Sequence, residues 1–224
     1  MGDRRIDLHI HSFFSDGVLL PSEILRRAQA LDFEAIAITD HVDASNLEEV
    51  LESLLRLLEE QESDRPITFI PGVELTHVSP ASIPRLAKRA KELGAGLVLV
   101  HGETIVEPVI EGTNRAAVEC PDVDLLAHPG FITLREAEIA ARNGVYLELS
   151  ARGGHALTNG HVARVALAAG AKLVVNSDAH SPSDLIGQEM ARLVAKGAGL
   201  NEEEVERATV INPRELVKRA LERR

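Results

Sequence analysis

Cysteine and aromatic residues are nearly absent from this sequence. Cys120 is its only cysteine, tryptophan does not occur, and aromatic residues make up 3% of the 224 positions. A single cysteine excludes an internal disulfide and a zinc cage built from cysteines. So few aromatic rings also argue against a platform on which single-stranded bases would stack. We therefore expect neither a disulfide-stabilised fold nor a surface for single-stranded nucleic acid.

Long apolar runs and an excess of positive charge are missing as well. No stretch is apolar over a length that spans a bilayer, and the first ten residues, MGDRRIDLHI, lack the hydrophobic segment of a signal peptide. The formal net charge is −11, whereas binding to nucleic-acid phosphates relies on lysine and arginine. We therefore expect a cytoplasmic protein without membrane contacts, whose partner is a small phosphorylated molecule rather than a nucleic acid. The oligomeric state stays open.

The sequence does contain a regular alternation of short apolar runs and longer stretches with helical periodicity, which is typical of repeated βα units around a parallel sheet. No linker divides the chain, so a single domain over residues 1–224 is expected. The expected strands lie near residues 5–9, 35–39, 67–71, 96–100, 123–127, 145–149 and 172–176. Helices are expected to begin near Pro21, Leu47, Ile83, Val109, Leu134, His161 and Ser183, and a closing amphipathic helix to cover residues 213–224. The pattern predicts an α/β fold, a closed or nearly closed (β/α)7 barrel.

Histidines and acids follow six of the seven runs. They are His9, His11, Asp16, His41, Glu74, His101, His128, Asp178 and His180. Because side chains alternate along a strand, His9 and His11 point the same way and can hold one metal ion or two adjacent ones. Imidazole combined with carboxylate suits zinc, manganese, iron or cobalt. Barrels of this type carry their active sites at the carboxyl ends of the strands, so we expect a metal centre there.

The motifs DLHIHS, SDG, ITDH, PGVE and NSDAH, in this order between Asp7 and His180, resemble those of the PHP (polymerase and histidinol phosphatase) family of metal-dependent phosphoesterases. The resemblance implies a distorted, TIM-like barrel of seven strands with three divalent transition-metal ions, zinc, manganese or iron, at its carboxyl face. It also implies three ligand sets, which are His9, His11, Glu74 and Asp178; Glu74, His101 and His128; and Asp16, His41 and His180. Glu74 would bridge the first two ions.

The resemblance implies an enzyme that hydrolyses a small phosphomonoester, with histidinol phosphate as one candidate. A hydroxide bridging two metal ions would attack phosphorus, so no serine or cysteine nucleophile is needed. Glu74, Asp178 and His180 would then be catalytic. A nuclease or nucleotide phosphatase of the same family is an alternative. A noncatalytic barrel subunit of a polymerase or ribonucleoprotein assembly is an alternative of another class, but degraded ligands would be expected there and none is degraded here.

The loop after the sixth run, residues 151–160, contributes nothing to this ligand pattern. It contains Arg152, His155 and two glycines and leads into a helix, so that a cation and backbone N–H groups could converge on an anion. A planar guanidinium binds two phosphate oxygens at once. We therefore expect Arg152, with His155 as a weaker partner, to contact the substrate rather than a metal. A purely structural loop is the alternative.

Three further polar residues lie close to the expected ligands in the sequence. Asp7 and Asp40 are candidates for hydrogen bonds that orient imidazoles, with a strand-end or capping role as the alternative. His77 follows Glu74 by three positions, and an exposed position in a loop is expected for it.

Overall fold

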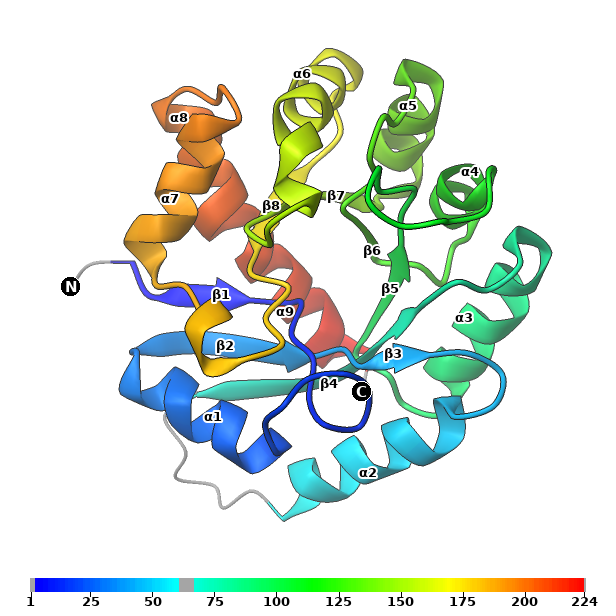
Figure 1. Cartoon of the computed structure of the whole chain (residues 1–224), viewed down its shortest axis with the longest axis vertical. Helices are drawn as coiled ribbons and strands as arrows, with labels where there is room; N and C mark the ends of the chain where they lie inside the picture. The colour runs from blue at the N-terminus through cyan, green and yellow to red at the C-terminus, as the bar shows by residue number, and fades with distance from the viewer. Residues whose placement is uncertain (1–2, 61–66, 224) are drawn as a thin grey trace.

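The computed structural model describes residues 3–60 and 67–223 and contains parallel strands surrounded by helices (Figure 1). The strands follow the order β1-β2-β4-β5-β6-β7-β8, and the short β3 pairs with β4. They are β1 (Arg5–Asp7), β2 (Phe33–Ile38), β3 (His41–Val42), β4 (Thr68–Leu75), β5 (Leu97–His101), β6 (Leu125–Ala127), β7 (Tyr146–Ser150) and β8 (Leu173–Asn176). The predicted α/β barrel with seven principal strands is confirmed.

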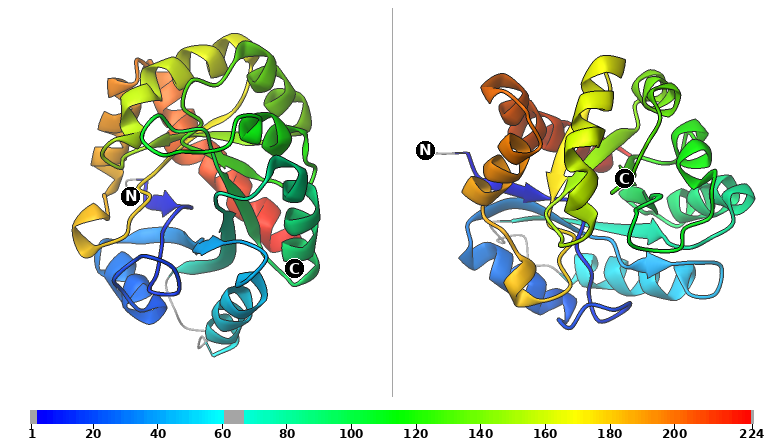
Figure 2. Two further views of the ribbon diagram at one scale, coloured as in Figure 1. Left: turned by 45° about the vertical axis from the view of Figure 1, so that its right-hand side comes forward. Right: turned by 45° about the horizontal axis from the view of Figure 1, so that its top comes forward.

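The helices pack around these strands (Figure 2). They are α1 (Pro21–Ala30), α2 (Leu47–Glu59), α3 (Ile83–Glu92), α4 (Thr113–Glu119), α5 (Leu134–Asn143), α6 (Asn159–Ala169), α7 (Gln188–Gly197), α8 (Glu202–Glu206) and α9 (Asn212–Glu222). Short 3-10 turns lie at η1 (Pro80–Ser82), η2 (His155–Thr158) and η3 (Pro182–Asp184), and a π turn at η4 (Arg207–Ile211). No helix in the described ranges is both long and apolar enough to cross a bilayer.

Two helices begin later than predicted. α4 starts at Thr113 rather than near Val109, because Gly112, with φ of 92°, places the chain in the left-handed region just before the helix. α7 starts at Gln188 because residues from Ser183 first form the turn η3. The predicted start at Leu134 is confirmed, and there Thr133 and Glu136 form a capping box.

The barrel interior is closed at its amino end by α9. Leu216 and Ala220 of this helix are fully buried against Ile6, Leu8 and Tyr146 and other apolar residues that point inward from the strands. Figure 1 shows α9 crossing behind the strands. This helix lies where the closing amphipathic segment is expected, and residue 224 lies outside the described residues.

The barrel is closed along a seam between β1 and β8, which are not paired as strands. At this seam the backbone of Ile10 bridges to Ala179, and the amide of Asp178 donates to the carbonyl of His9 over 3.0 Å. The side chain of Asn176 also accepts from the amide of Leu8, 168 residues away in sequence, over 3.0 Å. The seam thus joins β1 to β8, next to the expected ligands His9 and His11 on one side and Asp178 and His180 on the other.

Candidate metal centre

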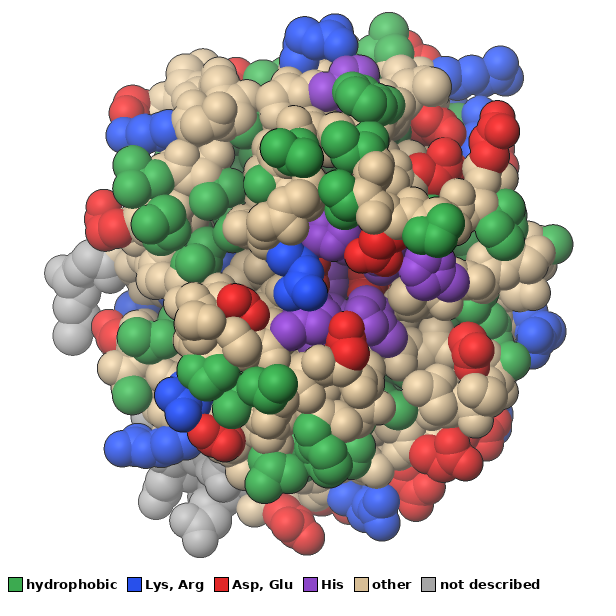
Figure 3. All heavy atoms as spheres, in the orientation of Figure 1, with side chains coloured by type: hydrophobic (Ala, Val, Ile, Leu, Met, Phe, Trp, Pro, Cys, Tyr) green, Lys and Arg blue, Asp and Glu red, His purple; other side chains and the backbone are tan. Residues whose placement is uncertain are grey.

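A cavity of about 210 Å³ opens at the carboxyl end of the strands. Figure 3 shows histidine side chains gathered in this hollow, with acidic and basic groups beside them. It is lined by Asp16, His41, Thr76, His77, His101, Glu107, His128, Arg152, His155, Asp178 and His180. A larger cavity, of about 340 Å³, lies beside α6 and α9 and contains none of the predicted site residues. The chemistry of the chain is therefore concentrated in the smaller cavity.

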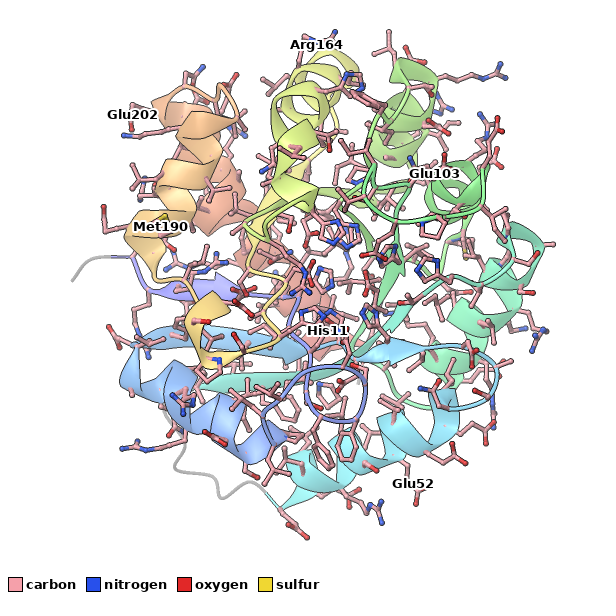
Figure 4. The ribbon with its side chains drawn as sticks, in the orientation of Figure 1. His11, Glu52, Glu103, Arg164, Met190 and Glu202 are labelled. Atoms are coloured by element: carbon pink, nitrogen blue, oxygen red, sulfur yellow. The ribbon has the colours of Figure 1, made fainter. Side chains whose placement is uncertain are left out.

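The first predicted ligand set is brought together at the bottom of this cavity. The Nε2 atom of His9 lies 3.4 Å from Glu74 Oε1, and that of His11 lies 3.3 Å from Asp178 Oδ1. All four side chains are buried. His11, labelled in Figure 4, lies among the ring side chains at the centre of the site.

The third predicted set lies nearer to the surface. Asp16 Oδ1 is 3.0 Å from His180 Nε2 and 3.5 Å from His41 Nε2. Together with His11, these residues offer ligand atoms that all lie within 4.8 Å of one another. The side chain of Asp16 is 55% exposed, so this group faces the solvent side of the cavity.

The second predicted set is only partly assembled as expected. Glu74 Oε1 lies 3.5 Å from His128 Nε2, and these two residues group with His9. His101 groups instead with His128 and His155, and its Nε2 atom lies 3.2 Å from the carboxylate of Glu107. The sequence pattern assigned neither Glu107 nor His155 to a metal.

The donor atoms in this cavity fit divalent transition-metal ions. The Nε2 atoms of His9 and His11 face each other at 3.0 Å, and the buried Glu74 Oε1 has no hydrogen-bond partner. Buried polar atoms are normally paired, and buried carboxylates are costly without a cation. A set of imidazole and carboxylate donors is the combination that zinc, manganese or iron prefers.

Opposite charges shift the pKa values within the buried group. Burial lowers the pKa of His9, but Glu148, Glu74 and Asp178 outweigh it and raise that pKa well above its usual value. Burial, with His41 and His9, keeps the pKa of His11 well below its usual value. Burial raises the pKa of Glu74, yet His9 and His41 hold it well below its usual range. The cavity therefore combines an ionised carboxylate with a neutral imidazole available as a ligand.

Glu148 on β7 is a functional candidate that the sequence analysis missed. Its Oε1 accepts hydrogen bonds from His9 Nδ1, at 2.8 Å, and from Asn176 Nδ2, at 2.9 Å. Its Oε2 accepts from the amide of His128 at 3.0 Å. Such bonds fix the orientation of ligand imidazoles. A glutamate inside the apolar run VYLELS is the signal that could have identified it, because an acid is rarely buried without a partner.

Of the two roles considered for Asp7 and Asp40, the structure favours the strand-end or capping role, because no hydrogen bond to an imidazole is found for either carboxylate among the described residues. Asp7 pairs with Arg5 and accepts from the amide of Ser177. Asp40 accepts from the amide and hydroxyl of Ser12 and from the hydroxyl of Ser15. Both carboxylates stabilise backbone segments next to the site, because the hydrogen-bond donors nearest to them are amides, hydroxyls and a guanidinium.

His77 is exposed, as predicted, but it lines the cavity. Its Nε2 atom lies 3.2 Å from the carboxylate of Glu107. A hydrogen bond from His101, together with the nearby His155 and His77, lowers the pKa of Glu107 to about 2, against the effect of burial. Glu107 is therefore an ionised group at the mouth of the cavity.

Arg152 and His155 both reach the same cavity. Nη1 of Arg152 lies 2.6 Å from His180 Nδ1 and donates to the carbonyl of Asp178 over 3.2 Å. The Nδ1 atom of His155 lies 2.8 Å from the hydroxyl of Thr104, and its Nε2 lies 3.9 Å from Asp178. The side chain of Arg152 is 33% exposed and that of His155 only 4%, so the arginine is the more accessible of the two from the solvent.

The sequence profile of the family described as RNase P subunit p30 matches residues 4–224. The chain belongs to the RNase P subunit p30 family. An uncharacterized protein of Methanocaldococcus jannaschii, MJ1295, is 50% identical over 216 residues, which cover 96% of this chain and 99% of that protein. This member of the RNase P p30 family and its relative thus correspond over nearly their whole lengths.

Two solved structures have the same fold as this RNase P p30 family member. One is a chain of archaeal ribonuclease P with mature tRNA, with 16% identity and a TM-score of 0.64, covering 96% of this chain and 89% of that chain. The other is histidinol phosphate phosphatase from Lactococcus lactis with zinc, L-histidinol and phosphate, with 18% identity and a TM-score of 0.60, covering 88% of this chain and 94% of that chain. The predicted PHP-like fold is confirmed, and the RNase P p30 family shares it.

Proposed function

We propose that this chain is a metal-dependent phosphoesterase that hydrolyses a small phosphomonoester. The observation that carries the proposal is the convergence of all nine predicted ligands at one end of the barrel, most of them buried. Burying so many ionisable groups together costs folding free energy unless cations bind among them. A barrel that served only as a scaffold would gain nothing from this arrangement.

The proposed centre holds up to three divalent ions, with zinc, manganese or iron as candidates. Such ions activate water and neutralise charge on phosphoryl oxygens. The first and third ligand sets are those expected from the sequence. Glu74 lies between the first set and His128, while His101 groups with His128 and His155. Asp178 and His180 would stand beside the reacting groups. Glu148 keeps the ring of His9 in place through its 2.8 Å hydrogen bond. This support leaves Nε2 of His9 directed at Glu74 and Asp178.

Arg152 is proposed to bind the phosphoryl group of the substrate. Its side chain lines the cavity and is partly exposed, and it extends from the end of β7 over Asp178 and His180. A guanidinium at this position can orient two phosphoryl oxygens and so hold the ester in line for attack.

The proposal is tested with the full chain loaded with zinc, manganese or iron. Hydrolysis of monoesters is measured by the release of inorganic phosphate, and hydrolysis of diesters by chromatography of the products, because cleavage of a diester releases no inorganic phosphate. The substrates are histidinol phosphate, nucleoside monophosphates, sugar phosphates and phosphodiesters, and Glu74→Gln serves as the inactive control. Repeated turnover of a monoester, abolished in the control, is the expected result. A fully metal-loaded protein that releases phosphate from none of the monoesters would contradict the proposal. Turnover of diesters alone would favour the nuclease alternative, and turnover confined to the nucleoside monophosphates would favour the nucleotide phosphatase alternative.

A second candidate is a noncatalytic subunit of a ribonuclease P assembly, which the family match favours. The net charge of −11 weakens it, because RNA binding relies on cationic groups that meet phosphates. An electrophoretic shift assay with a structured RNA at physiological salt separates the two functions. Tight binding that weakens with added salt, without phosphate release, would support the subunit function.

A further inference from the structure

The loop between β5 and α4, residues 102–112, brings a carboxylate to the cavity that no sequence motif indicated. Glu107 Oε2 lies 3.2 Å from the Nε2 atoms of both His101 and His77. Its Oε1 lies 3.4 Å from His155 Nε2. One carboxylate therefore contacts three imidazoles from different loops and strands.

This loop is held firmly in position. Glu103 Oε1 accepts from the amides of Gly112 and Asn114, and the Asn114 side chain donates to the carbonyl of Pro129. A Cβ atom at Gly130 would lie 1.9 Å from the carbonyl oxygen of Glu103, so the loop packs directly against the turn that follows His128. These contacts hold the backbone of the loop that carries Glu107 at the edge of the cavity.

His155 is oriented by the same loop. Its Nδ1 atom is engaged by Thr104 Oγ1 at 2.8 Å, which leaves Nε2 directed into the cavity. An imidazole that binds a metal usually has its other ring nitrogen engaged in this way. The rings of His155 and His128 stack at 4.1 Å, and the ligand atoms of these two residues and His101 lie within 4.8 Å of one another.

The spacing around Glu107 is that of groups sharing one ion. Two ligands at the usual zinc bond lengths in a tetrahedral site lie about 3.3 Å apart. Glu107 lies 3.2 Å from His101 and 3.4 Å from His155. We infer that Glu107 and His155, together with His101 and His128, form a metal position at the mouth of the cavity. The inference rests on the proposed metal-dependent function and adds to it a ligand pair outside the nine-residue pattern.

Glu107 has a distinct place among these ligands. Its side chain is 37% exposed, whereas those of His101 and His155 are 2% and 4% exposed. A carboxylate on the solvent side is the ligand that an incoming phosphoryl oxygen can replace, since it can turn away without unpacking the core. The three imidazoles would hold the ion while this exchange takes place.

The test is a titration of metal-free, full-length protein with Co²⁺, followed by visible absorption, and with Zn²⁺, followed by calorimetry. Glu107→Gln is compared with Glu111→Gln, which removes an exposed carboxylate of the same loop. Glu107→Gln is expected to weaken one binding step by about tenfold or more and to change the cobalt spectrum, while Glu111→Gln matches the unaltered protein. His155→Ala should weaken the same step, and the double variant should weaken it less than the two single effects combined.

The readout is metal binding and not activity, so the two proposals can fail separately. If Glu107→Gln and His155→Ala, both folded by circular dichroism, bind cobalt and zinc as the unaltered protein does, the inference is overturned even where phosphatase activity is found. If the binding step is lost in these variants but no phosphomonoester is hydrolysed, the metal position stands and the proposed function fails. An unaltered protein that binds neither ion would overturn the inference.

Discussion

The two ends of the barrel are built from the same strands but bury different side chains, apolar ones at the amino end and ionisable ones at the carboxyl end. At the amino end, Leu216 and Ala220 of α9 fill the interior and contact apolar residues such as Ile6 and Leu8. At the carboxyl end, β1 continues into His9, and the interior fills with imidazoles and carboxylates. Burial of apolar surface stabilises the first end, whereas the second end gathers groups that repel or lack partners. The closed end therefore supplies the rigidity on which the open end depends.

Buried polar atoms without a hydrogen-bond partner are more numerous at the carboxyl end, although Arg5 Nε at the start of β1 is also unpartnered. Among the described residues, Nδ1 of His11, His101 and His128 and Oε1 of Glu74 are buried without a hydrogen bond. Each such atom destabilises the fold by about 1 to 3 kcal/mol. A bound cation would relieve this cost at Glu74 Oε1, whereas the Nδ1 atoms face away from the proposed ions and their cost must be offset by the apolar end.

Leu216→Ala is expected to have the largest effect, and only on stability. It removes the side chain that fills the amino end, where Leu216 is fully buried, and should lower the free energy of unfolding by about 2 to 5 kcal/mol. Urea unfolding measures this change. The control is Leu221→Ala, since Leu221 lies on the same helix but is 46% exposed. Equal effects of the two variants would show that α9 does not close the barrel.

Glu74→Gln should have the opposite effect to Leu216→Ala, with a large loss of activity and little change in stability. Removing the charge between two ligand sets is expected to lower kcat by roughly a hundred- to a thousandfold, or about 2.7 to 4 kcal/mol, because phosphoryl charge is then poorly neutralised. The variant should remain folded in urea unfolding. Phosphate release is compared with that of Glu138→Gln, an exposed glutamate of α5. Near-normal turnover with full metal occupancy would rule out the proposed bridge.

Glu148→Gln tests whether the carboxyl end depends on its supporting hydrogen bonds. An amide nitrogen cannot accept the bonds that His9 Nδ1 and the His128 amide donate, so a ring or a backbone segment must shift. Metal affinity should fall by roughly ten- to a hundredfold, as measured by calorimetry with zinc. An unchanged isotherm would mean that packing alone orients His9.

Arg152→Ala should have the smallest effect on the centre, because this side chain is partly exposed. Metal content is expected to stay constant while kcat/KM for the best substrate falls by roughly ten- to a hundredfold, or about 1.4 to 2.7 kcal/mol. Arg142→Ala, at an exposed position of α5, is the matched control. Loss of metal in Arg152→Ala would instead place the arginine among the groups that support the ligands.

The sequence predicted those features of the fold and the candidate site that depend on local periodicity. The apolar runs predicted the strands, and residues directly after them, such as His9, His101 and His128, do meet at one end of the barrel. Glu107 could not be found in this way, because its loop has no period and its contacts are with residues distant in sequence. Glu148 could not be found in this way either, because it lies within the sixth run, the one run that no expected ligand follows.

The ligand motifs predicted the fold but did not identify the RNase P p30 family. They predicted the PHP-like fold because the motifs comprise the residues at the carboxyl ends of the strands, where the expected ligands lie. Membership in the RNase P p30 family rests on similarity across residues 4–224 and not on the ligand motifs alone. The chemistry of a cavity can therefore be read from a few residues, whereas the lineage of a chain cannot.

The seam between β1 and β8 has a consequence for folding. His9 and Asp178 meet there through a backbone hydrogen bond of 3.0 Å, with about three quarters of the chain between them. An ion held by both side chains would act as a reversible cross-link, and closing a loop of this length restricts the unfolded chain as a disulfide does. Metal uptake should then slow hydrogen exchange at the amides of His11 and Asp178 more than at those of α9. A bound ion would thus stabilise the contact between β1 and β8, the first and last strands of the barrel.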